Sequence, residues 1–189
     1  MTDKDKNQFS HKRNYNSRIV YENRWISVRE DRFTTEDGLD MLFGITKVVD
    51  GIAVLAVDHD NVYLVDEFKY AVQRRSIEVV CGAIDKEDLL PVEAAKRELK
   101  EELGFKADRI ISMGVIDPFT SVIDSKVHLF IAIGLEAGTP CFDAGEDIVP
   151  VCYSMKKAFD MVDNGTITHA PTILLLQKYE RLKKELNCL

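Results

Sequence analysis

The stretch that most constrains this chain is the nine-residue run RELKEELGF, which spans 97–105. It carries three glutamates, Glu98, Glu101 and Glu102, and their spacings of three and four residues place the side chains on one face of a helix. Like charges so close together destabilise an isolated helix, so we expect something to compensate them. The pattern favours a hard divalent cation with oxygen ligands, which can in turn hold a phosphate-bearing substrate.

The residues around this run predict where the helix begins and ends. Gly82 follows an apolar stretch and precedes an acidic loop, and Pro91 with the alanines behind it predicts a helix start. Gly104 predicts the helix end, because glycine readily takes the left-handed conformation there. Leu90 occupies the N-cap position, where Asp or Ser is usual. The predicted unit is therefore strand, loop, acidic helix and loop.

This unit resembles the signature of the Nudix hydrolase family, G-x5-E-x7-R-E-U-x-E-E-x-G-U, in which U is a bulky apolar residue. Every defined position in 97–105 matches, whereas Gly82 lies one residue further from Arg97 than the signature has it. Either Glu87 or Asp88 can therefore stand for the signature's first glutamate. A lone E-x-x-E-E motif is usually a solvated helix face, but the longer match is specific.

The resemblance implies hydrolysis of a phosphoanhydride in a nucleoside diphosphate linked to another group, with Mg²⁺ or Mn²⁺ as cofactor. It implies that Glu98 and Glu102 are metal ligands, and that Glu101 is a further ligand or a base. The backbone carbonyl of Cys81 is the third implied ligand, and its thiol is expected to be buried and not a nucleophile. Arg97 resembles the signature arginine, which holds the acidic cluster by bidentate pairing, and the alternative is a surface ion pair.

Length and composition limit the classes of protein to which the chain can belong. Its 189 residues suit one domain with an appendage, and 46% hydrophobic residues suffice for a core. The net charge of -7 disfavours a nucleic-acid partner. There is no apolar run of membrane-spanning length, and the polar N-terminus predicts no secretory signal. The spacing of the four cysteines disfavours a zinc site and suits free thiols, so we expect a cytoplasmic protein.

Hydrophobic patterning predicts a strand-rich chain with one central helix and two terminal helices. Residues 1–17 suit a flexible N-terminal tail, and 18–49 suit an antiparallel hairpin with strands at 18–30 and 41–49. Residues 50–189 form the predicted Nudix hydrolase domain. Further strands are expected at 51–57, 62–65, 76–81, 110–116, 126–135 and 148–153, and helices at 91–103, 154–163 and 172–186. The predicted fold class is α+β, an α/β/α sandwich of a mixed sheet with flanking helices, which is the Nudix layout.

The flanking segments resemble the branch of the family that cleaves ADP-ribose and nucleotide sugars. The segments concerned are 18–49, 51–55, 65–70, 77–85 and 164–170. In that branch the N-terminal strands reach across a homodimer, and each site uses both chains. The resemblance implies that Trp25 stacks on the base, that Lys69 replaces a substrate-binding arginine, and that Glu78 hydrogen-bonds the base or ribose. The alternatives are sheet core for Trp25 and a strand-edge charge for Glu78.

One catalytic residue of that branch has no direct counterpart here. The ADP-ribose members carry a catalytic glutamate where this chain has Ala144, so Asp143 or Glu146 would have to substitute for it. Neither His59 nor His169 is expected to be catalytic, and both are expected at the surface.

The sequence thus predicts a metal-dependent pyrophosphohydrolase acting on a small-molecule nucleotide. The preferred substrate is ADP-ribose or another NDP-sugar, and the products are a nucleoside monophosphate and a sugar phosphate. One alternative is a nucleotide-binding sensor that cleaves weakly or not at all, which Ala144 suggests but the intact glutamate set disfavours. The other is a sanitiser of oxidised nucleoside triphosphates, which the long N-terminal hairpin disfavours.

Overall fold

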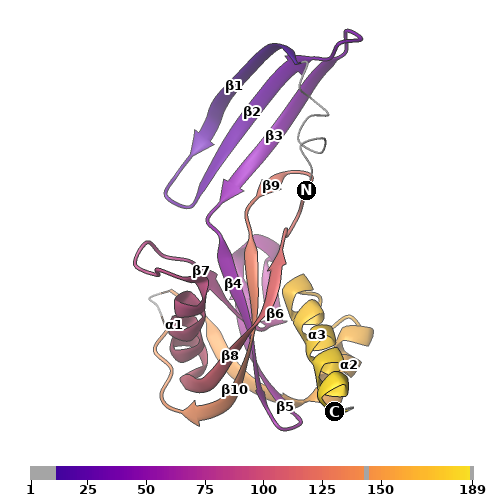
Figure 1. The fold of residues 1–189 in the computed structure, drawn as a ribbon. Helices are drawn as coiled ribbons and strands as arrows, with labels where there is room; N and C mark the ends of the chain where they lie inside the picture. Colours follow the sequence, from indigo (N-terminus) through magenta and orange to yellow (C-terminus); the bar gives the residue numbers. More distant parts are fainter. Residues whose placement is uncertain (1–11, 143–144, 188–189) are drawn as a thin grey trace. The chain divides into compact units, whose positions relative to one another are not determined.

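The computed structural model describes residues 12–142 and 145–187, with side chains placed as far as Lys183 (Figure 1). Residues 1–11 of the expected tail lie outside the described residues. The chain divides into an N-terminal unit, which extends to Val49 and includes Asp117–Lys126, and a sandwich unit, Asp50–Ile116 with Val127 onwards. Among the described residues, no helix has both the length and the apolar character that a membrane crossing requires.

The N-terminal unit is a sheet of three long antiparallel strands and one short strand, with one more long strand than the sequence predicted. Its strands lie in the order β1 (Arg13–Glu22), β2 (Ile26–Thr34), β3 (Asp40–Val48) and the short β9 (Ile123–Asp124), which pairs parallel with β3. The single strand expected at 18–30 was wrong, because the chain turns between β1 and β2. At that turn the side chain of Asn23 accepts hydrogen bonds from the backbone N–H groups of Trp25 and Ile26 at 2.8 and 2.9 Å.

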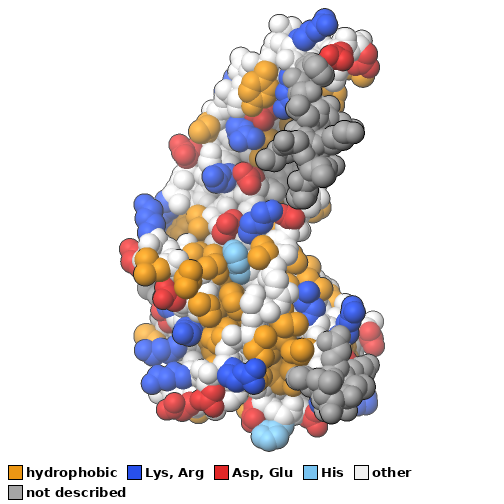
Figure 2. Space-filling view, in the orientation of Figure 1, with side chains coloured by type: hydrophobic (Ala, Val, Ile, Leu, Met, Phe, Trp, Pro, Cys, Tyr) orange, Lys and Arg blue, Asp and Glu red, His pale blue; other side chains and the backbone are white. Residues whose placement is uncertain are grey.

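Charged side chains of both signs are interspersed on this sheet, and Figure 2 shows them alternating on the face in view. Glu30 on β2 pairs with Arg18 on β1 at 3.0 Å and with Arg32 at 2.8 Å. Near the β2–β3 turn, Phe33 and Phe43 stack with ring centroids 5.8 Å apart. Cross-strand pairs of this kind stabilise a sheet. The pair of Arg18 and Glu30 joins β1, whose side chains are all exposed, to β2.

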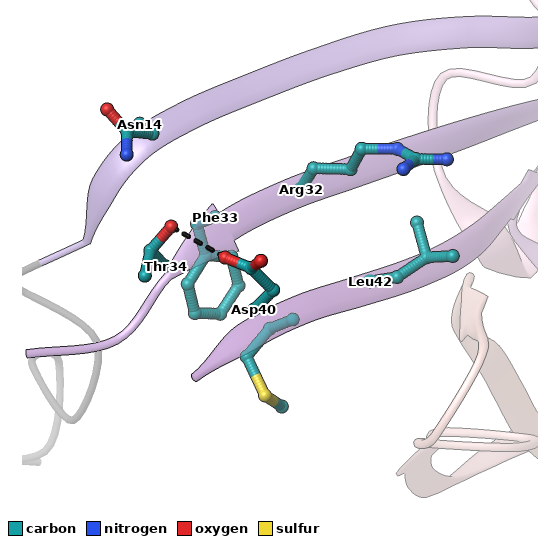
Figure 3. A pocket seen from close by; sticks show the side chains of 7 residues that line it. Asn14, Arg32, Phe33, Thr34, Asp40 and Leu42 are labelled. Atoms are coloured by element: carbon teal, nitrogen blue, oxygen red, sulfur yellow. Dashed lines mark hydrogen bonds between the residues drawn. The ribbon is translucent and has the colours of Figure 1, made fainter. Parts of the chain in front are cut away.

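A shallow pocket of about 380 Å³ lies beside the β2–β3 turn of the N-terminal unit. Figure 3 shows the side chains of Asn14, Arg32 and Phe33 around it, and the hydroxyl of Thr34 donating to Asp40 at 2.9 Å. Among the described residues, Asp40 is the only carboxylate that lines this pocket, so the described part of its lining lacks the convergent acidic groups that the sequence leads us to expect at the functional site.

The sandwich unit contains a seven-stranded mixed sheet and three α-helices. The central strands lie in the order β11 (Ile148–Ser154), β5 (Asn61–Lys69), β4 (Gly51–Asp58), β10 (Val127–Ala137) and β8 (Phe105–Ile116), while β6 (Arg74–Glu78) pairs with β5 and β7 (Val80–Ala83) pairs with β4. The helices are α1 (Pro91–Leu103), α2 (Met155–Asp163) and α3 (Ala170–Asn187), and Tyr70–Val72 forms one 3₁₀ turn. Strand β4 runs parallel to β10, and the other pairings are antiparallel.

Helix α1 covers one face of this sheet, and helices α2 and α3 cover the other (Figure 1). Strand β4 shows how both faces are filled, because its alternating side chains enter two different hydrophobic clusters. Leu55 belongs to the cluster under α2 and α3, whereas Val54 belongs to the cluster under α1 with Ala95 and Leu99. The predicted α/β/α sandwich is confirmed.

Helix α1 begins and ends where the sequence predicted. Pro91 is its first residue, and the side chain of Glu93 accepts hydrogen bonds from the backbone N–H groups of Leu89 and Leu90 at 2.9 and 3.3 Å. The helix therefore has an ordered N-terminus although Leu90 cannot cap it. Gly104 ends the helix with a φ of 72°, the left-handed conformation that glycine adopts without strain.

Candidate active site

Arg97 connects helix α1 to the strand and the loop that precede it. Its Nη1 donates to Glu98 Oε1 at 2.7 Å and to Glu101 Oε2 at 3.1 Å. Its Nη2 donates to the carbonyl oxygen of Ala83 and to Asp88 Oδ2, both at 3.0 Å. Because one planar guanidinium fixes two helix carboxylates, a strand carbonyl and a loop carboxylate, Arg97 is not an ordinary surface ion pair.

The contacts of Arg97 indicate which of Glu87 and Asp88 stands for the first glutamate of the signature. Asp88 bonds Arg97, accepts the backbone N–H of Asp85 at 3.0 Å, and keeps only 9% of its side chain exposed. The hydrogen bond from Arg97 lowers the pKa of Asp88 and so favours its ionised form. Glu87 is exposed on the outside of the loop. The extra loop residue therefore leaves an acidic side chain in contact with Arg97.

Glu98 and Glu102 lie one turn apart on α1 and face the sheet. Glu102 is only 4% exposed, and its Oε2 is buried without a hydrogen-bond partner among the described residues. Burial, together with the neighbouring Glu98, raises the pKa of Glu102 to about 9, and burial raises the pKa of Glu98 to about 7 although Arg97 opposes it. A buried carboxylate and a half-buried one, both with raised pKa values, form a site that attracts positive charge.

Gly82 allows Glu98 to approach strand β7. A Cβ atom at this position would lie 1.9 Å from Glu98 Oε1 and 2.1 Å from its carboxyl carbon. With Glu98 in this position, only glycine fits at residue 82, because any Cβ would overlap the carboxylate. The spacing of Gly82 and Glu98 in the sequence therefore corresponds to a close contact between backbone and carboxylate.

Lys69, Glu78 and His169 form a second group of polar side chains in the sandwich unit. The ammonium group of Lys69 contacts Glu67, and it lies 3.9 Å from Glu78 Oε2. His169 Nε2 lies 3.6 Å from the same oxygen of Glu78. The expectation that His169 is a surface residue was wrong: its side chain is only 23% exposed, and burial lowers its pKa. His59, in contrast, is exposed as expected.

Cys81 lies on β7 between this second group and the carboxylates of α1. Burial raises the pKa of its thiol well above the ordinary value, and the charges of Glu102 and Glu78 act in the same direction. A thiol held in its protonated form is a poor nucleophile, which agrees with the expectation from the sequence. Its main chain pairs with Ala53 of β4 and leads directly into Gly82.

The remaining candidates lie outside these two groups. Glu146 is exposed, but its charge raises the pKa of Glu98 and of Glu102, so it contributes to the potential at both carboxylates. Asp143 and Ala144 lie outside the described residues. Trp25 belongs to the N-terminal unit, where it is 60% exposed, and the guanidinium of Arg24 lies 4.4 Å from its ring centroid. The alternative that Trp25 is sheet core was therefore wrong.

The carboxylate group fits a hard divalent cation. Its ligand atoms are carboxylate oxygens, which Mg²⁺ and Mn²⁺ prefer. The buried Oε2 of Glu102 has no hydrogen-bond donor among the described residues, so the protein itself does not compensate that oxygen. A bound cation would satisfy this oxygen and favour the ionised forms of Glu98 and Glu102.

Two family models match the sequence. The model described as NUDIX domain matches residues 47–176, and the model described as nucleoside diphosphate sugar hydrolase N-terminal domain matches residues 15–39. The first match includes both polar groups of the sandwich unit, and the second covers most of β1 and all of β2.

Curated relatives agree with these matches. The chain is 28% identical to an ADP-ribose pyrophosphatase of Bacillus subtilis (strain 168), over 76% of this chain and 78% of that protein. It is 23% identical to a methanol dehydrogenase activator of Bacillus methanolicus, over 89% and 91% of the two chains. A solved structure of an ADP compounds hydrolase has the same fold, with a TM-score of 0.80 and 20% identity, covering 92% of this chain and 95% of that chain.

Proposed function

The chain belongs to the NUDIX domain family, and on that premise we propose that it hydrolyses the pyrophosphate bond of a nucleoside diphosphate linked to another group. The proposed substrate is ADP-ribose or another NDP-sugar, which would yield a nucleoside monophosphate and a sugar phosphate. The observation that carries this proposal is the Glu98–Glu102 pair of α1, in which Glu102 is buried and Glu98 lies against Gly82. The N-terminal sugar-hydrolase match and the relative named ADP-ribose pyrophosphatase support the substrate class.

NUDIX hydrolases generally need a divalent cation, and we propose Mg²⁺ or Mn²⁺ for this chain. Glu98, Glu102 and the backbone carbonyl of Cys81 would hold it, because Glu98 lies against Gly82 and the charge of Glu102 acts on the neighbouring Cys81. When bound, the cation supplies neutralisation of charge on the diphosphate oxygens and a lower pKa for the attacking water. The protein's contribution is to keep these oxygen ligands buried and fixed before substrate arrives.

Arg97 and Glu101 then have distinct roles. Arg97 holds Glu98 and Glu101 through a single nitrogen, so that both carboxylates keep a fixed orientation on the helix. Glu101 is 37% exposed, so one side of its carboxylate remains open to accept a proton from the attacking water. Glu146 or Asp143 is the alternative base. In the reaction the water oxygen bonds to phosphorus, the bridging phosphoanhydride bond breaks, and the water proton passes to the carboxylate.

The second polar group suits the rest of the substrate. Lys69 offers a positive charge for a phosphate or for the terminal sugar, and Glu78 offers an acceptor for a base amine or a ribose hydroxyl. Trp25 offers an exposed ring on which a base can stack. A homodimer in which each site uses both chains, as the resemblance implies, would bring Trp25 of the partner subunit to this site.

A substrate panel tests the proposal. The panel contains ADP-ribose, other NDP-sugars, NADH, dinucleotides and nucleoside triphosphates, each assayed with Mg²⁺ and with Mn²⁺. Fastest turnover of ADP-ribose or another NDP-sugar, with a monophosphate and a sugar phosphate as products, supports the proposal. Preferred release of free pyrophosphate from triphosphates identifies the sanitiser alternative instead. Tight binding by calorimetry without any product identifies the sensor alternative and refutes hydrolysis.

A further inference from the structure

A thiol, an imidazole and a carboxylate converge beside the carboxylates of α1. Sγ of Cys81, a ring nitrogen of His169 and a carboxylate oxygen of Glu78 all lie within 4.8 Å of one another. They come from three different elements: Cys81 is on β7, Glu78 ends β6, and His169 immediately precedes α3. The proposed function uses the backbone carbonyl of Cys81 and leaves its thiol and the imidazole of His169 without a role.

The chemistry of this group differs from that of the Glu98–Glu102 pair. Zn²⁺ binds sulfur and imidazole nitrogen more readily than Mg²⁺ does. It also accepts a carboxylate oxygen as a third ligand. Zinc–ligand bonds of roughly 2.0–2.3 Å in a tetrahedral arrangement separate neighbouring ligand atoms by roughly 3.3–3.7 Å. His169 Nε2 and Glu78 Oε2 are already 3.6 Å apart. Side-chain adjustments of about 1 Å would bring the whole set to that geometry.

The surrounding structure holds this group in place. His169 Nδ1 lies 2.9 Å from the hydroxyl of Thr172, which is fully buried and also accepts the backbone N–H of Val79 at 2.9 Å. When Nδ1 carries the ring proton and donates it to this hydroxyl, Nε2 presents its lone pair towards Glu78. Orientation of a metal-binding histidine by a hydrogen bond on its second nitrogen is a general property of zinc sites. Because Val79 lies between Glu78 and Cys81, the same hydroxyl ties all three ligand segments together.

The neighbouring charges are compatible with a cation. Glu102 and Glu67 add negative charge beside the thiol. Among the described groups that shift the pKa of the thiol, Lys69 is the one with a positive charge. Its ammonium group contacts Glu67 as well as Glu78. Lys69 can therefore release Glu78 to a metal and keep its bond to Glu67. His169, 23% exposed, leaves the group open to solvent at one side.

We propose that Cys81, His169 and Glu78 form a Zn²⁺ site that is distinct from the Mg²⁺ or Mn²⁺ ligands of the proposed reaction. In binding, the sulfur donates an electron pair to zinc and the thiol proton passes to solvent, while the imidazole binds as the neutral ring. A water molecule completes the tetrahedral coordination, as in zinc sites with three protein ligands. The proposal does not depend on the substrate, because metal binding alone tests it.

The test uses the full-length protein, freed of metal by a chelator and then saturated with Mg²⁺ to occupy the carboxylates of α1. Co²⁺ is added as a spectroscopic probe for zinc, since a thiolate ligand gives it a charge-transfer absorption in the near ultraviolet. The wild type is expected to show this absorption at one equivalent of Co²⁺ and to lose it when Zn²⁺ is added. Cys81→Ala is expected to lack the absorption and to bind Zn²⁺ at least about tenfold more weakly.

Matched variants separate this site from others. His169→Gln is a second test that keeps Cys81 in place, and it is expected to weaken Zn²⁺ binding as Cys81→Ala does. Cys141→Ala removes an exposed thiol elsewhere, and Glu102→Gln removes a ligand of the other site. Both are expected to keep the cobalt absorption. Absence of the absorption in the wild type, or Zn²⁺ binding of wild-type strength in Cys81→Ala and His169→Gln, would overturn the proposal.

Discussion

The single residue Glu102 explains why this site lowers the stability of the metal-free protein. The Glu102 carboxylate is 4% exposed, lies next to Glu98, and has no hydrogen-bond donor for Oε2 among the described residues. Packing of the surrounding residues therefore keeps it in place. Such a group is favourable only when a cation or a proton neutralises it. Replacing it should therefore have opposite effects on activity and on metal-free stability.

We expect Glu102→Gln to fold normally and to lose at least two orders of magnitude in hydrolysis. A metal contact contributes several kcal/mol to transition-state stabilisation, and about 1.4 kcal/mol is a tenfold change in rate. Steady-state kinetics at saturating Mg²⁺ measures the loss. Lys100→Gln changes an exposed residue of the same helix and is the control, with nearly unchanged rates. Retention of more than about half the wild-type activity by Glu102→Gln would show that Glu102 is not a ligand.

The same substitution should change how metal-free stability depends on pH. The pKa of Glu102 is raised from 4.5 to about 9, so the folded state retains a proton that the unfolded state has lost over that range. Stability of the metal-free wild type should therefore fall as pH rises from 4.5 towards 9, and Glu102→Gln should remove much of that fall. Urea unfolding in chelator at pH 6 and pH 9 measures it. Equal pH dependence in both proteins would contradict the burial of an ionisable Glu102.

Gly82→Ala tests the close approach of Glu98 to strand β7. The new Cβ would overlap the Glu98 carboxylate, which is the far end of a flexible side chain and can move without disturbing the backbone. We expect a folded protein whose Mg²⁺ affinity, measured by calorimetry, is reduced about tenfold or more, because one ligand is displaced. Gly44→Ala, on β3 with open space around its position, is the control and should bind Mg²⁺ like the wild type.

At the scale of elements, the sequence predicted those parts of the fold whose signals are local. Helix α1 was predictable because Pro91 and Gly104 mark its ends, and β4 because its buried run is continuous. Strand β1 was only partly predicted: residues 13–17 were wrongly assigned to a flexible tail, and 18–22 were joined to β2 in a single strand. All ten residues of β1 are exposed, so no buried face marks its extent.

In the candidate site, too, some positions were predictable from local sequence signals and others were not. The positions of Glu98 and Glu102 follow from helical spacing alone, which a sequence displays directly. The contact of His169 with Glu78 joins residues 91 positions apart, supported by the hydrogen bond from the N–H of Val79 to Thr172 on α3, and no local pattern encodes it. For the same reason, cysteine spacing along the chain could not show which side chains meet at Cys81.

Asp31 should make the stability of the N-terminal sheet depend on pH. Burial raises the pKa of Asp31, but hydrogen bonds from Ser17 on β1 at 2.6 Å and from Arg29 at 2.9 Å outweigh it, so the pKa lies below the ordinary 3.8. A lowered folded pKa contributes stability above pH 3.8, and that contribution is lost as pH falls through the folded value. Asp31→Asn should thus cost about 1 kcal/mol at pH 7 and progressively less in acid.

Urea unfolding followed by tryptophan fluorescence measures the stability of the N-terminal sheet, because Trp25 is the only tryptophan and lies between β1 and β2. Asp163→Asn, at the end of α2 in the sandwich unit, is the control and should leave the fluorescence transition unchanged. An Asp31→Asn transition that matches the wild type at pH 7 would show that the Ser17 and Arg29 contacts contribute no stability.

At the scale of the whole molecule, the N-terminal unit has an exposed edge strand. Strand β1 is the last strand of its sheet, with one side unpaired among the described residues, and it carries the exposed apolar side chains of Ile19, Val20 and Tyr21. A long edge strand with apolar side chains is a ready partner for another chain. We propose that it is covered by a second copy of this chain, as the resemblance to the sugar-hydrolase branch implies.

This last proposal predicts a homodimer at micromolar concentration, with twice the mass of the chain by light scattering. The double variant Ile19→Lys, Tyr21→Lys places charges on β1 and is expected to be monomeric. Because each site of the dimer would use both chains, its hydrolytic rate should fall as well, while Mg²⁺ still binds at Glu98 and Glu102. Leu89→Lys adds charge at a still more exposed apolar residue of the sandwich unit and should remain dimeric. A monomeric wild type, or dissociation of Leu89→Lys to the same extent, would refute an interface at β1.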